Sequence, residues 1–179
     1  MKKRWVLALG SALLSSAVMA APFGEEADIK YSQDLWSALS SAGLVGADAI
    51  MSTPYTGQHP HGAVLDTIDA KVSVGGVNDL VIIKRNYGGE GVSKQAVADN
   101  PSKYLQAVTV MYKRKGFDAD NQDWFWVKYK PDGSLHVNPK GMQLAGAVAK
   151  GAKAGCIACH TAAPGGDMVF NHDRYAKGM

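Results

Sequence analysis

The sequence predicts an α+β fold in which a small antiparallel β-sheet is accompanied by a few helices. Two observations support this fold class. Runs rich in β-branched and aromatic residues recur along the middle of the chain, and turn-forming segments separate them. Other segments show the helical spacing of apolar residues instead. The 179 residues suit one domain with a single core once an N-terminal leader is set aside.

The first 20 residues have the pattern of a secretory signal peptide. Three basic residues at positions 2–4 precede an apolar run from Trp5 to about Val18, and a small residue, Ala20, follows. The apolar run is shorter than the roughly 20 residues that span a bilayer. We therefore expect cleavage after Ala20 and export of a single domain over residues 21–179. An uncleaved anchor is the alternative.

Loss of the leader also balances the charge of the chain. The precursor has 19 Lys and Arg against 16 Asp and Glu, and the leader contains three of the basic residues. The mature chain therefore carries almost no net charge, so we expect neither a nucleic acid nor a membrane surface as a partner.

The secondary structure follows from local patterns. A helix is expected over 31–43, where Leu35, Trp36 and Leu39 share one face. A second helical segment, 92–105, is expected to stop near Asn100, because a proline disfavours helix in the residue before it. Four strands and a further helix complete the prediction, the strands over 70–74, 79–84, 106–113 and 123–130 and the Ala-rich helix over 140–155.

The only two cysteines, Cys156 and Cys159, stand three positions apart, and His160 follows directly. C-x-x-C-H is the attachment signature of c-type haem. Each thiol forms a thioether to the macrocycle, and the histidine binds the iron as the proximal ligand. A local disulfide and a zinc site are the alternatives, although zinc would need a fourth ligand that nothing nearby clearly offers. We predict one covalently bound haem c.

Three segments of the chain resemble one known family. They are "NDLVIIKRNYGG", "AVTVMYKRKGFDADNQDWFWVKYKPDG" and "GCIACHTAAPGGDMVF". Their order is similar to that in the cytochrome P460 family, which includes the beta-type cytochromes c-prime. The resemblance runs over about 31–170, and its best anchors are Lys84, the "DWFWV" strand and the haem motif.

The resemblance implies a periplasmic protein, often a homodimer, in which an antiparallel sheet packs over a five-coordinate haem. In the cytochromes P460 proper, a strand lysine is cross-linked to the porphyrin. These enzymes oxidise hydroxylamine to nitrous oxide and pass electrons to a soluble acceptor such as another cytochrome c. The beta-type cytochromes c-prime lack the cross-link and bind nitric oxide or carbon monoxide. A simple electron-transfer cytochrome with six-coordinate iron is a third possibility.

Lys84 is the position on which this choice depends. Strand alternation places it on the side of Leu80 and Ile82. If that side faces the haem, a desolvated neutral amine could attack the porphyrin edge. In the alternative, Lys84 ends the strand and reaches water, and periodicity does not choose, because both sides of the run are apolar. The resemblance implies that Lys84 is the cross-linking residue and therefore catalytic.

Hydroxylamine oxidation also needs a proton acceptor, and the family enzymes carry a carboxylate on the strand that corresponds to 106–113. This strand has Thr109 between two valines and no acid, which favours gas binding. His59 and His61 lie two apart, and a loop role is favoured over metal binding or proton relay. An axial role for either histidine would oppose the five-coordinate pattern.

The remaining candidates are aromatic or follow the haem motif. Trp124 and Trp126 should share one face of their strand, with Phe125 on the other. We expect most aromatic residues in the core and one as a lid on the distal pocket, chosen from these three or from Tyr87, Tyr112 and Phe117. Met168 is interpreted as a packing residue, and Asp167 as a partner of His160 or a capping residue.

Overall fold

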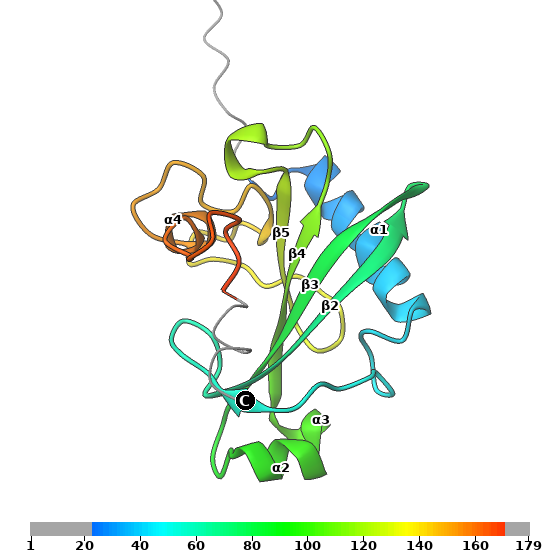
Figure 1. Ribbon diagram of the computed structural model, residues 1–179, viewed down its shortest axis with the longest axis vertical. Coiled ribbons are helices and arrows are strands. Elements are labelled where there is room, and N and C mark those ends of the chain that lie inside the picture. The colour runs from blue at the N-terminus through cyan, green and yellow to red at the C-terminus, as the bar shows by residue number, and fades with distance from the viewer. Residues whose placement is uncertain (1–22, 171–179) are drawn as a thin grey trace, which may run out of the picture.

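A computed structural model describes residues 23–170 of the protein. Figure 1 shows a twisted sheet with α1 on one side and the segment that contains α4 on the other. The six strands are ordered as in the sequence and every neighbouring pair is antiparallel. The α+β prediction is confirmed. The strands are β1 Tyr55–Thr56, β2 Val64–Val74, β3 Val77–Tyr87, β4 Leu105–Lys113, β5 Trp124–Tyr129 and β6 Ala145–Gly146. The helices are α1 Glu26–Ser41, α2 Lys94–Asp99, α3 Pro101–Tyr104, the 3-10 turn η1 Ala119–Asn121 and α4 Cys156–His160.

The hairpin of β2 and β3 sets the register of the sheet. Its two turn residues, Gly75 and Gly76, have φ of 60° and 83°. A two-residue hairpin favours positive φ at both positions, which glycine adopts without a steric penalty. The turn fixes the pairing along the whole hairpin, so Lys84 lies opposite Thr67. The two strands predicted here are confirmed, and both are longer than expected.

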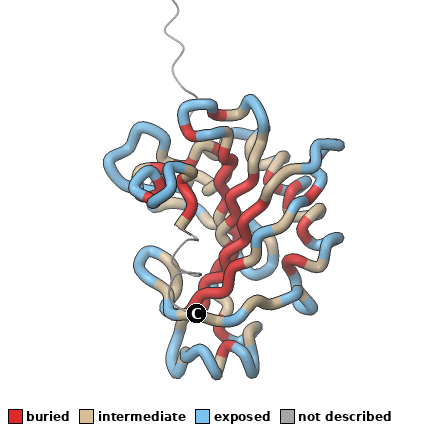
Figure 2. The backbone as a smooth tube through the Cα atoms, viewed as in Figure 1, coloured by how far each residue is buried: buried red, intermediate tan, exposed pale blue. Residues whose placement is uncertain are grey.

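The face of the sheet that α1 covers holds the larger core. Leu35 and Leu39 of α1 are fully buried against Ile83, Val110 and Phe125 of the sheet. The expected helix over 31–43 is confirmed and begins earlier, at Glu26. Figure 2 shows the buried residues gathered along the central strands and near α4. Burial of these aliphatic side chains, each worth about 1.5–3 kcal/mol, orients the sheet so that its other face turns toward α4.

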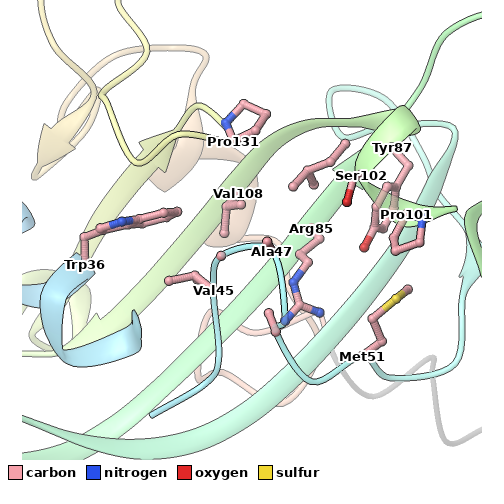
Figure 3. Close-up of a pocket in the computed structure, with 13 residues that line it drawn as sticks. Trp36, Val45, Ala47, Met51, Arg85, Tyr87, Pro101, Ser102, Val108 and Pro131 are labelled. Carbon is pink, nitrogen blue, oxygen red and sulfur yellow. The ribbon is translucent and has the colours of Figure 1, made fainter. Parts of the chain in front are cut away.

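A buried ion pair also lies on the α1 side. Arg85 donates to both carboxylate oxygens of Asp66, at 3.0 and 2.8 Å, and to the carbonyls of Leu44 and Ile50. Tyr87 donates to the same carboxylate at 2.8 Å. Figure 3 shows the guanidinium in a small pocket there, among the residues that follow α1. Because these groups are already hydrogen-bonded to one another, the pocket has a structural role: its hydrogen bonds connect the sheet to the 44–52 segment.

The predicted helix over 140–155 is wrong. The segment forms turns and the short strand β6, which pairs with Trp126 and Val127 of β5. Gly146 and Gly151 have φ of 103° and 73°, values outside the helical region. Alanine content alone therefore misled the prediction, because sheet pairing satisfies the backbone in place of a helix. The helix predicted in the 92–105 segment does stop near Asn100 as expected, at the end of α2, and a second short helix, α3, follows it.

The predicted leader, residues 1–20, lies outside the described residues. The single domain over 21–179 stays a prediction. Among residues 23–170, no helix is both long and apolar enough to cross a membrane.

Candidate haem site

The cysteines and His160 lie on α4, which packs on the face of the sheet opposite α1. Cys156 is half-buried and Cys159 is exposed, and no disulfide joins them. Ile157 is buried in a cluster with Trp126 of β5 and Val148, which holds the helix against the sheet. Residues three apart in a helix lie on neighbouring parts of its surface, so both thiols are placed for one ligand beside the helix.

His160 has the environment of a metal-binding histidine. It is 8% exposed, and its Nδ1 lies 2.7 Å from the carbonyl oxygen of Met168. A carbonyl only accepts, so Nδ1 carries the hydrogen and Nε2 has a free lone pair. Such a bond fixes the ring orientation of metal-ligating histidines. The sequence suggested Asp167 as partner, but its Oδ1 accepts the backbone N–H of Val169 at 3.0 Å. The Met168 side chain packs in the core as expected.

Lys84 faces the same side as His160. Its alternating neighbour Ile82 packs in the cluster beneath α4, whereas Val81 and Ile83 belong to the core under α1. The condition under which Lys84 reaches the site is therefore met. The side chain is 9% exposed, and its charge contributes to lowering the pKa of both His160 and His61. Lys84 is thus close to both histidines.

His61 also lies at this site. Its Nδ1 is 2.8 Å from Oδ1 of Asn86, the next residue after Lys84 on that face of β3. The His61 and His160 ring centroids are 6.4 Å apart, with planes at 82°. Figure 1 shows the loop that precedes β2 on the same side of the sheet as α4. The loop prediction was right, but the loop belongs to the site.

The 57–62 loop that carries His61 is closed at its base. The N–H of Gly57 donates to the carbonyl of Ala63 and that of His61 to the carbonyl of Gln58, both at 2.9 Å. A side chain at Gly62 would collide with the backbone of Tyr87. Glycine at this position therefore lets the loop pack against the end of β3, where Asn86 forms its hydrogen bond with His61.

Both histidines are neutral at physiological pH. Burial, with a smaller contribution from Lys84, lowers the pKa of His61 to about 4. Burial is also the main reason that the pKa of His160 is lowered. Neutral imidazole is the form that binds metals, so the environment favours ligation over a protonated role.

The residues present fit a haem. The Trp126 ring lies 4.8 Å from that of His160, and its buried Nε1 has no hydrogen-bond partner among the described residues. A haem propionate would be a suitable acceptor for this N–H, and Lys84 and Lys128 place positive charge nearby. Within residues 23–170, no group of three or more His, Cys, Asp or Glu is placed to hold a bare metal ion.

The acid that shares the face of Lys84 lies on β2 and not on β4. Thr109 of β4 pairs with Lys84 and donates to its carbonyl at 3.2 Å, so β4 offers no acid there, as expected. Asp69 of β2 lies opposite Ile82 and shares the face of Lys84. It is exposed. Strand alternation combined with the Gly75–Gly76 turn could have identified it.

The aromatic residues divide between the two faces. Trp124 and Trp126 lie on the α4 side and Phe125 on the α1 side, which confirms the predicted alternation. Tyr112 and Phe117 pack with the α1 core, and Tyr87 bonds Asp66. The suggestion that Phe125 or one of these three covers the distal pocket is therefore wrong, because all four point to the opposite face of the sheet.

A family model described as Cytochrome P460 matches residues 46–171, more than half of the chain. The chain belongs to the cytochrome P460 family. The match includes the 57–62 loop, all six strands and α4, and thus every element that forms the site. Membership together with the Cys156–His160 motif implies a c-type haem in this cytochrome P460 protein. No curated protein and no solved structure matches the chain.

Proposed function

We propose that this cytochrome P460 protein is a periplasmic, homodimeric monohaem cytochrome that acts on small nitrogen species at the iron. Hydroxylamine is the first candidate, with nitric oxide next. The observation that carries the proposal is the placement of buried Lys84 on the face of the sheet that α4 covers, close to His160. The resemblance implies that a lysine cross-linked to the porphyrin distinguishes the hydroxylamine-oxidising members from the gas binders of the family, and Lys84 is placed to form such a bond.

The roles of the motif residues follow from their geometry. Cys156 and Cys159 form the two thioethers, and His160 Nε2 binds the iron while Met168 holds Nδ1. The haem, when bound, supplies one-electron redox chemistry and an iron site for the nitrogen ligand. Trp126 and Lys128 would hold the propionate edge. Lys84 is joined to the macrocycle edge and tunes its electronic properties.

Oxidation of hydroxylamine to nitrous oxide releases as many protons as electrons. The electrons leave through the haem edge to a soluble acceptor such as another cytochrome c. The protons need an acceptor, and Asp69 is the acid that shares the face of Lys84. Water reaches this exposed carboxylate, so protons can pass from it to solvent.

A second candidate function is non-catalytic binding of nitric oxide or carbon monoxide, as in the beta-type cytochromes c-prime. The observation that favours it is Thr109, which pairs with Lys84 where the family enzymes carry a carboxylate. A plain electron-transfer cytochrome is the third, and it would bind none of these ligands.

The test is anaerobic turnover of hydroxylamine by the purified holoprotein with a one-electron acceptor. Reduction of the acceptor and production of nitrous oxide are followed together. We expect both in the natural protein, loss of both in Lys84→Leu, and retention in Lys71→Leu, which alters an exposed lysine on the same face of β2. If the natural protein binds nitric oxide but does not turn over hydroxylamine, the second candidate function, gas binding, replaces the first.

A further inference from the structure

The spacing of His61 and His160 is that of two ligands of one metal. An imidazole centroid lies roughly 3 Å from a metal bound at Nε2, given metal–nitrogen bonds of roughly 2 Å. Two axial histidines of one iron therefore have centroids roughly 6 Å apart. The observed separation is 6.4 Å. A small ligand held between the iron and a distal histidine would place the rings roughly 2 Å further apart. The observed separation therefore matches direct ligation by both rings better.

The hydrogen bonds of Asn86 decide which nitrogen of His61 is protonated. The Asn86 Nδ2 lies 2.8 Å from the carbonyl oxygen of Lys84 and 3.3 Å from that of Ala107, so the Asn86 amide must direct its N–H groups at these two carbonyls. Oδ1 then faces His61, and it can only accept. Nδ1 of His61 therefore carries the hydrogen, and Nε2 has the free lone pair.

The two histidines thus have matching environments. Met168 holds Nδ1 of His160 through a carbonyl, and Asn86 holds Nδ1 of His61 through an amide oxygen. Each bond leaves Nε2 as the ligating atom, as is usual for metal-bound histidines. An octahedral iron that bound these two imidazoles on opposite sides would have four positions left, and the four porphyrin nitrogens would fill them.

His61 is also held in place rather than carried on an open loop. The Gly57–Ala63 bond closes its loop, and Gly62 fits against Tyr87 with no space for a side chain. The neighbouring His59 lies in the same loop, but only His61 makes the contacts to Asn86 and His160. His59 is therefore the matched control.

We propose that His61 is the sixth axial ligand of the haem iron in the resting protein, and that a small nitrogen ligand binds only after His61 has left. This departs from the five-coordinate pattern of the family. The inference rests on the haem of the proposed function but not on hydroxylamine turnover. Dissociation of His61 from the iron is then the step that limits ligand access.

The test is the spin state of the purified holoprotein, read from its optical and electron paramagnetic resonance spectra. We expect a low-spin, six-coordinate haem in the natural protein and in His59→Ala, and a high-spin haem in His61→Ala. Carbon monoxide binding to the reduced protein is the second measurement. Its rate should level off with gas concentration in the natural protein, and should rise linearly in His61→Ala. Asn86→Ala should raise the plateau on the order of tenfold, because the bond that orients His61 is lost.

The outcomes separate this inference from the proposed function. A high-spin natural protein overturns the inference even where hydroxylamine is oxidised, and so does a low-spin haem that persists in His61→Ala. A low-spin natural protein that turns high-spin in His61→Ala but neither binds nor oxidises nitrogen species supports the inference and overturns the proposed function. If His61→Ala does not fold, carbon monoxide binding to Asn86→Ala decides the matter, and a plateau no higher than that of the natural protein overturns the inference.

Discussion

Lys84 and Arg85 are consecutive residues of β3, and their side chains lie on opposite faces of the sheet. Arg85 enters a saturated ion pair under the 44–52 segment, where it donates to Asp66 and two carbonyls. Lys84 lies near the two histidines of the haem site. One residue therefore serves the fold and the other the site, which allows stability and chemistry to be changed separately.

Removal of one member of the Arg85–Asp66 pair should destabilise the protein strongly. In Arg85→Leu the Asp66 carboxylate keeps its bond from Tyr87 but becomes a buried charge without a counter-ion. We expect a loss of about 3–5 kcal/mol in the free energy of unfolding, measured with denaturant. The haem spectrum of the folded fraction should not change. A loss below about 1 kcal/mol would show that water reaches the pair.

Substitutions should separate the covalent attachment of the haem by the cysteines from the binding of its iron by His160. Both experiments use the Lys84→Leu background, which removes the proposed bond from Lys84 to the macrocycle. In that background, Cys156→Ser with Cys159→Ser should release the haem into acidified organic solvent, because no covalent bond to the haem remains. Cys159→Ser without the second cysteine change should keep the haem attached through Cys156. Mass spectrometry of the intact chain measures both, and loss of covalent haem from the Cys159→Ser variant would show that Cys156 does not form a bond.

His160→Gly should leave the haem attached but without its proximal ligand. Because Met168 and the surrounding core remain in place, the variant should bind added imidazole in the vacated space, and the natural spectrum should return. Titration of the variant with imidazole tests this. A spectrum that is already natural without imidazole would mean that another residue is the proximal ligand.

The 57–62 loop should be sensitive to a single methyl group. In Gly62→Ala the new Cβ meets the backbone of Tyr87, so the loop must shift and move His61 away from Asn86. We expect the same change to high spin as in His61→Ala. Ala63→Ser, an exposed neighbour, is the control and should keep the natural spectrum. An unchanged spectrum in Gly62→Ala would show that the position of the loop does not hold His61.

Much of the sheet could be predicted from the sequence because alternation and turn residues are local signals. The place of His61 could also have been predicted. A two-residue turn at Gly75 and Gly76 pairs Val64 with Tyr87, which brings the residues before β2 to the end of β3. The five-coordinate pattern that the resemblance implies argues against an axial role for His61, so this pattern and the strand pairing led to different expectations.

Other features depend on the path of the chain and leave no local signal. The partner of His160 is a backbone carbonyl of Met168, and a carbonyl has no sequence signature. The 140–155 segment looks helical, yet pairing of β6 with β5 decides its conformation. The Asp66–Arg85 pair likewise joins β2 to the 44–52 segment through tertiary contacts.

The proposed bond between Lys84 and the haem is tested most directly by the spectrum of the reduced haem in alkaline pyridine. Pyridine replaces both axial ligands, so the spectrum reports the macrocycle regardless of His61. We expect bands displaced from those of ordinary haem c in the natural protein, and ordinary haem c bands in Lys84→Leu. Ordinary haem c bands in both proteins would contradict it.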